Sequence, residues 1–252
     1  MKSYFRTIPI IFLIGMFNNI EAQNSVVNGS FEDFINCPDA PSQIQRASEW
    51  DVVPNTGMGS PDYLNSCALS TSHVDVPASL FGNQLAYEGN AYMGIGVYSP
   101  TVVNAREYAQ TELNAPLEAG QNYTVSFMVS RAEISGYAIN NLGVVLGVDA
   151  LDGDGTNTYI DIASSIHTSD VIVDTNDWVQ VSGNYLASGG EKFLAIGNFF
   201  SDQNTTVLTA GDSPIAYYFI DSVSVVPNTL NLDDTKFQGF SVAPNPFTDE
   251  II

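Results

Sequence analysis

The clearest pattern along the chain is an alternation of apolar and polar residues over positions 123–131. The odd positions from 123 to 129 are Tyr, Val, Phe and Val, whereas positions 124, 126 and 130 are Thr or Ser, with Met128 as the exception. A period of two with β-branched and aromatic residues predicts a strand with one side on a core. Such a strand needs neighbours on both edges and a second sheet over its apolar side.

Other short segments of this kind follow one another along the chain, separated by turn residues. The predicted strands are Ser25–Phe34, Ser42–Val53, Gln84–Tyr87, Ala91–Tyr98, Ala105–Leu113, Asn141–Leu151, Thr158–Ile162, Val171–Val173, Trp178–Leu186, Lys192–Gly197 and Ala216–Val226. Glu88–Asn90 has the composition of a hairpin turn, and the polar stretch before Asn83 predicts a long surface excursion. Because no segment sustains a helical period, the sequence predicts an all-β, two-sheet sandwich over residues 23–226.

Composition and charge narrow the class of function. Hydrophobic residues make up 44% and aromatic residues 11% of the chain, which is enough for a sizeable core. Lys and Arg number 7 against 28 Asp and Glu, a formal net charge of -21. Such a surface repels phosphate backbones and anionic membranes, so nucleic acid is not expected as a partner. Acidic loops instead suit divalent cations, and oxygen ligands favour Ca²⁺. The simpler alternative is that the acidity only keeps a secreted protein soluble.

The first 22 residues have the organisation of a signal peptide. Lys2 and Arg6 precede an apolar run over residues 8–17, and Ala22 ends a plausible cleavage site. The run is too short to span a bilayer, and no later segment is long and apolar enough to do so. We therefore expect export, with no membrane span in the mature chain.

Export changes the reading of the two cysteines, Cys37 and Cys67. An oxidising compartment favours a disulfide between them, and two buried free thiols are the alternative. Two thiols without a nearby histidine do not make a zinc site.

Catalytic residues are scarce in the sequence. Its two histidines, His73 and His167, lie in polar segments where solvated loop residues are the simpler interpretation. No Gly-x-Ser-x-Gly motif is present, and carboxylates are too numerous for any pair to stand out. The sequence therefore favours a protein that is not an enzyme.

Aromatic and basic residues supply the candidates for ligand binding. Residues that could stack on sugar rings are Trp50, Tyr63, Tyr87, Tyr92, Tyr98 and Tyr185, although most aromatics are needed in the core. We expect Tyr63 and Tyr98 to be loop residues that contact the ligand. Arg106 is a third candidate, because it could hold a carboxylate or sugar hydroxyls; pairing with an acid such as Glu107 is the alternative.

Two carboxylates stand in apolar phases near the ends of the predicted domain. Asp221 alternates in phase with Phe219, Val223 and Val225, and Glu32 with Phe34. Burying an unpaired carboxylate is costly, so each side chain needs a cation, an Arg partner or backbone hydrogen bonds.

These end segments, Asn28–Glu32 and Phe219–Val225, resemble the opening and closing strands of galactose-binding-like jelly-roll domains, a superfamily that includes many carbohydrate-binding modules. The resemblance implies a jelly-roll topology. It also implies a structural Ca²⁺ ion held between the first and last strands, with Glu32 and Asp221 as its ligands.

A wider resemblance runs through most of residues 25–226. The segments Pro61–Cys67, Gly89–Ile95, Arg106–Gln110, Gly189–Glu191 and Ile196–Phe199 together resemble a group of secreted surface proteins of Bacteroidota. In the linker and tail, residues 227–252, Phe240–Asp249 resembles the start of a type A sorting domain for type IX secretion. That resemblance implies the type IX secretion machinery as a partner and a partial sorting signal in this chain.

Together these patterns predict a non-catalytic binding module, secreted or held at the outer cell surface, whose ligand is a neutral glycan. A strongly acidic protein repels polyanions, so the ligand should be neutral or cationic. The alternatives are a structural or adhesion protein of the envelope that engages a protein partner, and third, a glycoside hydrolase or an esterase.

Overall fold

The structure is a computed structural model that describes residues 23–56, 59, 61–155 and 159–228. The predicted signal peptide and all but the first two residues of the predicted linker and sorting segment lie outside the described residues. No helix within those described ranges is long and apolar enough to cross a membrane.

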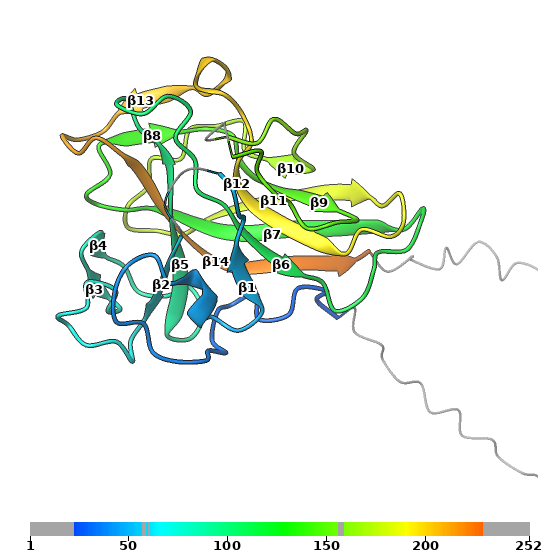
Figure 1. The fold of residues 1–252 in the computed structure, drawn as a ribbon, viewed down its shortest axis with the longest axis horizontal. Coiled ribbons are helices and arrows are strands. Elements are labelled where there is room, and N and C mark those ends of the chain that lie inside the picture. The colour runs from blue at the N-terminus through cyan, green and yellow to red at the C-terminus, as the bar shows by residue number, and fades with distance from the viewer. Residues whose placement is uncertain (1–22, 57–58, 60, 156–158, 229–252) are drawn as a thin grey trace, which may run out of the picture.

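Two five-stranded antiparallel sheets form the body of the protein (Figure 1). The first sheet has the order β1-β6-β12-β9-β10, with strands Trp50–Val52, Ala109–Glu112, Phe193–Asn198, Leu142–Gly147 and Ile166–His167. The second has the order β11-β7-β14-β5-β2, with strands Val179–Leu186, Asn122–Arg131, Ala216–Pro227, Ala91–Tyr98 and Asp62–Asn65. Smaller elements are the hairpin β3–β4 (Ala78–Ser79, Gly82–Asn83), the pair β8–β13 (Tyr137–Ile139, Val207–Thr209), and the 3-10 turns η1 (Ile44–Arg46) and η2 (Asp202–Asn204).

The long strands alternate between the two sheets along the chain. β5, β7, β11 and β14 belong to the second sheet, and β6, β9 and β12, which come between them in the sequence, belong to the first. This is the connectivity of a jelly roll, and it confirms the predicted all-β sandwich.

The predicted organising strand is β7, and its alternation is realised in the structure. Tyr123, Val125, Phe127 and Val129 are at most 5% exposed and belong to the core between the sheets. β7 pairs with β11 on one edge and with β14 on the other. The first sheet closes the core from the other side, with residues such as Leu142, Val144, Leu194 and Ile196.

The last strand changes face in its middle, and here the sequence prediction is wrong. A register shift follows Asp221, where Ser222 adopts a φ of 51°. Phe219 and Asp221 lie on the outer side of the sheet, whereas Val223 and Val225 belong to the inner core. One extra residue in a β-bulge moves every later side chain to the opposite face.

Several other predicted strands are also wrong. In Ser25–Phe34 only isolated bridges form, at Val26 and Phe34. Gln84–Tyr87 is not a strand, so the turn at Glu88–Asn90 opens β5 without closing a hairpin. Residues 159–162 and 171–173 are likewise irregular.

Long connections cover parts of both outer faces. The covering loop (residues 66–90) packs Val74, Val76 and Phe81 onto Tyr92 and Phe219 of the second sheet. On the first sheet, the segment after β9 packs Leu151 and Ile160 over a cluster comprising Val53, Tyr108, Val145, Ala195 and Phe199. Among the described residues, no such connection covers the outer face of β11, of the first half of β7 and of the end of β14.

A disulfide between Cys37 and Cys67 ties the N-terminal segment to the start of the covering loop, with the two Cα atoms 5.7 Å apart. This confirms the predicted pairing. The bridge encloses a segment with a sequence separation of 30 residues.

Replacing both cysteines by serine should lower the free energy of unfolding by about 3–4 kcal/mol, because the unfolded chain regains the entropy of the closed loop. Denaturant titration of the double variant against the oxidised parent measures the loss. Thiol titration of the denatured, unreduced parent should find no free thiol; two reactive thiols would contradict the pairing.

Candidate functional site

The uncovered half of the second sheet carries short polar side chains, because the outward positions of its strands alternate with the apolar core positions. We call this surface the polar face. It consists of Thr124 and Ser126 of β7, Gln180, Ser182 and Asn184 of β11, and Ser224 of β14.

Strand register aligns three serines across the polar face. Ser126 of β7 lies opposite Ser182 of β11 on one side and opposite Ser224 of β14 on the other. Neighbouring strands lie about 4.8 Å apart, so the three hydroxyls form a row with that spacing. Neither these hydroxyls nor the Gln180 amide bond to any part of the chain that the structure describes. They are free to bond to a ligand.

Asn228 closes one border of the polar face. Its side chain accepts a hydrogen bond from Thr124 Oγ1 at 2.7 Å and donates one to Asn184 Oδ1 at 3.3 Å. These two polar groups are therefore already partnered, and the free groups lie toward the other end of β11.

At that other end, two aromatic rings border the polar face. Trp178 precedes β11 in phase with Gln180, and the ring of Tyr87 lies 6.4 Å from its ring, edge to face. Trp178 donates its indole N–H to Leu85 O at 3.0 Å and packs against the buried Tyr92, at 5.8 Å between ring centroids. Tyr87 is 53% exposed. The pair forms a fixed ledge with an open aromatic surface.

Two carboxylates hold the turn that carries Tyr87. The Tyr87 and Glu88 amides donate to Asp221 Oδ2 at 2.9 and 3.1 Å. From the other side, the Asn90 and Ala91 amides donate to Glu32 Oε1 at 2.7 and 2.9 Å. Four backbone amides of this turn are thereby bonded to side chains from the first and last parts of the domain.

This arrangement bears on the predicted Ca²⁺ ligands. Glu32 and Asp221 do lie on the same turn, but backbone amides point at the oxygens that a cation would need, and Ser222 N donates to Asp221 Oδ1 as well. No group of three or more His, Cys, Asp or Glu side chains that could hold a metal occurs within the described ranges. The donors as arranged do not fit a shared cation, and chelation of calcium-loaded protein tests the Ca²⁺ ion predicted from the sequence.

Burial still affects Asp221. Desolvation raises its pKa to about 7, although the amides of Glu88, Ser222 and Tyr87 act in the opposite direction. The amides therefore offset only part of the cost of burying the carboxylate.

Tyr63, predicted to be a ligand-binding loop residue, lies instead in β2 with its side chain in the core. It is fully buried, donates its hydroxyl to Phe31 O at 2.9 Å and accepts a bond from Asn65 Nδ2. Burial raises the pKa of Tyr63 to about 12. Its ring has no open face on which a sugar could stack.

Tyr98 and Arg106 lie near one another, away from Tyr63. Tyr98 ends β5, half-buried, with its ring 5.4 Å from that of Tyr137. Arg106 is fully buried; it donates to Ala105 O and Phe200 O and forms an ion pair with Asp202 at 2.9 Å. Arg106 thus joins two loops of the protein, and pairing with an acid, the alternative considered from the sequence, occurs with Asp202.

Two further acids, the buried Asp62 and the partly buried Glu107, lie beside Gly94 and Gly96 of β5. Asp62 accepts hydrogen bonds from the Tyr217 hydroxyl and from Ser42 N, and Gly94 leaves the space that the Tyr217 ring occupies. Glu107 accepts a bond from Gly96 N at 2.8 Å. Burial raises the pKa of Glu107 to about 7, and the nearby charge of Asp62 adds to the shift.

The sequence pattern does not distinguish Tyr87 from the other aromatic residues, and it does not predict the polar face. One signal was available, because Trp178 stands in phase with the polar side of its own strand. The three-serine row was not readable, since it depends on strand pairing and on the bulge in β14.

No protein-family model matches the chain, and no curated protein does. Solved structures with a similar fold exist. The K1 cleaved adhesin domain of Lys-gingipain from Porphyromonas gingivalis W83 is 15% identical, with 79% of this chain and 95% of that chain covered and a TM-score of 0.41.

Two further solved structures of similar fold are carbohydrate-binding modules. The CBM22-1 xylan-binding domain of Paenibacillus barcinonensis Xyn10C is 14% identical, with 79% and 91% coverage and a TM-score of 0.39. TmCBM61, solved with β-1,4-galactotriose, is 15% identical, with 82% and 100% coverage and a TM-score of 0.36. Similarity at this level does not indicate which ligand the protein binds. The chain's own residues have to indicate it.

The Glu107→Gln variant should flatten the dependence of stability on pH. The raised pKa means that the folded state binds the Glu107 proton more tightly than the unfolded state does. The free energy of unfolding should therefore fall as pH rises from about 4.5 to about 7, by about 1–3 kcal/mol from this group. Urea unfolding at intervals across that range measures the slope. The exposed Glu118→Gln variant is the control, and equal slopes in both variants would contradict the assignment.

A chelator should leave the melting temperature of calcium-loaded protein unchanged, because the amide donors around Glu32 and Asp221 do not fit a shared cation. Thermal melting with and without EDTA is the measurement. A drop in melting temperature that the Asp221→Asn variant no longer shows would instead establish a calcium ion at these residues.

Proposed function

We propose that this protein is a non-catalytic module that binds a neutral glycan on the polar face, against Tyr87 and Trp178. The observation that supports it most is the coincidence of free hydroxyls with an anchored aromatic ledge on the uncovered half of the second sheet. Sugar rings combine apolar C–H faces with rims of hydroxyls, so they need both kinds of surface.

The polar face suits a flat, extended ligand rather than a buried small molecule. Its side chains are short, and they project from three neighbouring strands whose positions the core fixes. A rigid surface of this kind loses little conformational entropy on binding. The row of Ser182, Ser126 and Ser224 would bond to successive hydroxyls of a chain.

Charge restricts the ligand class. The net charge of -21 repels polyanions, which favours a neutral polysaccharide over an acidic one. The free groups of the polar face are hydroxyls and an amide, which bond to hydroxyls without requiring charge.

The chemistry of the polar face supports binding rather than catalysis. Asp221, the carboxylate at its border, is buried and bonded to amides. His167 lies in β10 of the other sheet, against the ring of Phe200. The described part of the face therefore offers neither a placed base nor a pair of free carboxylates.

We also propose that the module works outside the cell, secreted or at the outer surface, after export through the N-terminal signal and handling by the type IX machinery. The Cys37–Cys67 bridge supports this, because disulfides persist in oxidising compartments. Export is inferred from the signal-peptide organisation of residues 1–22. Handling by the type IX machinery is inferred from the resemblance of residues 240–249 to a sorting domain.

Isothermal titration calorimetry against a panel of soluble neutral polysaccharides tests the proposal. We expect weak binding to at least one of them, and the Tyr87→Ala variant should weaken it about tenfold through loss of ring stacking. The Ser182→Ala variant should weaken it by a smaller factor, through loss of one hydroxyl.

The Phe34→Ala variant is the matched control, because Phe34 is an exposed aromatic outside the polar face. It should bind as the parent does. Absence of heat with every glycan, or equal losses in the Tyr87 and Phe34 variants, would contradict the proposal.

A further inference from the structure

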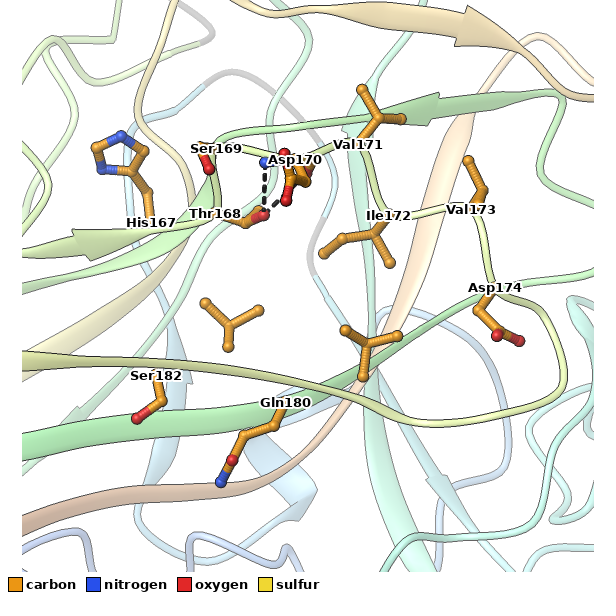
Figure 2. A pocket seen from close by; sticks show the side chains of 12 residues that line it. His167, Thr168, Ser169, Asp170, Val171, Ile172, Val173, Asp174, Gln180 and Ser182 are labelled. Carbon is orange, nitrogen blue, oxygen red and sulfur yellow. Dashed lines mark hydrogen bonds between the residues drawn. The ribbon is translucent and has the colours of Figure 1, made fainter.

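A groove of about 470 Å³ lies beside the edge strand of the second sheet. Residues 167–174 form one wall, and Val179–Ser182 of β11 form the other. Figure 2 shows the first wall running alongside β11, with Ile172 directed into the space between them. Gln180 and Ser182 point away from that space, toward the polar face. The groove is therefore a separate surface from the polar face.

The wall formed by β11 has unused backbone groups. β11 is the first strand of its sheet and pairs along its length with β7. In an antiparallel pair only alternate residues bond to the partner, so the remaining N–H and C=O groups point to the free edge. Within the described chain, no other backbone hydrogen bond involves Val179–Ser182. This stretch spans about 13 Å.

The base and rim of the groove are aliphatic. Ile172 and Val181 are buried at its base, and Val173 and Val179 are exposed at its rim. Its one aromatic lining residue is His167, whose imidazole packs against the ring of Phe200, so no Tyr, Trp or Phe ring in the lining is offered to a sugar. Aliphatic side chains of an extended peptide would fill the base at every second position.

Acidic groups surround the groove. Asp170 and Asp174 line it, and the exposed Asp177 lies on the connection to β11. The amides of Asp177 and Asn176 hold the pKa of Asp174 below its usual range, so it is charged at neutral pH. Arg131, the cation beside this wall, is engaged with Val173 O and Ser135 O.

The same charges argue against a second copy as the occupant. Edge-to-edge pairing of β11 with itself would bring two sets of these carboxylates together, between chains that each carry -21. Like charges across an interface are unfavourable. A basic partner would be attracted by these carboxylates, whereas a second copy would be repelled.

We propose that this groove binds an extended segment of a partner protein, which adds to the free edge of β11 as a strand. The segment carries aliphatic residues at alternate positions and at least one Lys or Arg between them. Backbone bonds to β11 hold it, the aliphatic base selects its side chains, and the carboxylates select its charge.

The probe is a fluorescein-labelled peptide of sequence Lys-Val-Thr-Val-Lys-Val, titrated with the full protein and followed by fluorescence anisotropy. We expect saturable binding that weakens with added salt. The same peptide with Glu for Lys, or with Pro for the central Thr, should bind at least tenfold more weakly. Hydrogen exchange should show new protection at those alternate amides of residues 179–182 that face the free edge.

Val179→Lys places a positive charge on the groove rim and should weaken binding at least tenfold. Leu186→Lys is its control, because Leu186 is exposed on the same strand but outside the groove. Asp170→Asn, which keeps the size of the side chain, should weaken binding and reduce its salt dependence. If Val179→Lys lowers the melting temperature of the protein, Asp170→Asn tests the groove without changing an apolar residue.

Several results would overturn the proposal. These are no anisotropy change with the basic peptide, equal effects of the Val179 and Leu186 variants, or protection elsewhere than at β11. Dimerisation in sedimentation velocity that Val179→Lys abolishes would identify a second copy as the occupant instead. Tyr87→Ala should leave peptide binding intact, so failure here is distinguishable from failure of the glycan proposal.

Discussion

The structure depends most on two carboxylates that hold one turn. Asp221 and Glu32 come from opposite ends of the domain, and together they accept the amides of residues 87, 88, 90 and 91. Burying a carboxylate costs several kcal/mol by order of magnitude, and amide hydrogen bonds offset part of that cost. In return the turn is fixed at a sheet surface, with the Tyr87 ring exposed beside Trp178. The buried Asp221 and the partly exposed Glu32 thus set the position of an aromatic side chain on the surface.

The architecture could be read from the sequence because the sandwich is built on alternation. The first half of β7 and most of β11 alternate in burial as the period-two pattern predicts, whereas β12 and the first half of β14 are buried on both faces. Segments such as Ser25–Phe34 failed for a physical reason. Side chains there bond to nearby backbone, as Asn28 does with Asp33 and Ser48, and replace the ladder of a strand. Alternation alone cannot reveal that competition.

The site was harder to read than the fold. Tyr63 stands among turn residues in the sequence but is buried, because β2 packs between the core and the covering loop. Arg106 was a candidate for ligand binding, yet it forms an ion pair with Asp202, almost a hundred residues later in the chain. The polar face needs the pairing of three strands, and only the position of Trp178 hinted at it. Side-chain partners that are distant in sequence decide these cases, and a single sequence does not show them.

The bulge in β14 makes the strand intolerant to changes in its length. Before Asp221 its odd positions serve the outer cluster, and after Ser222 they serve the inner core. Deleting one residue here would turn Val223 and Val225 toward solvent, or drive the carboxylate inward, along the most central strand of its sheet. Surface connections can gain or lose residues at small cost. Natural variation in length should therefore collect in the loops and spare the end of this strand, so that an aligned pair of homologues keeps its spacing between residues 216 and 226.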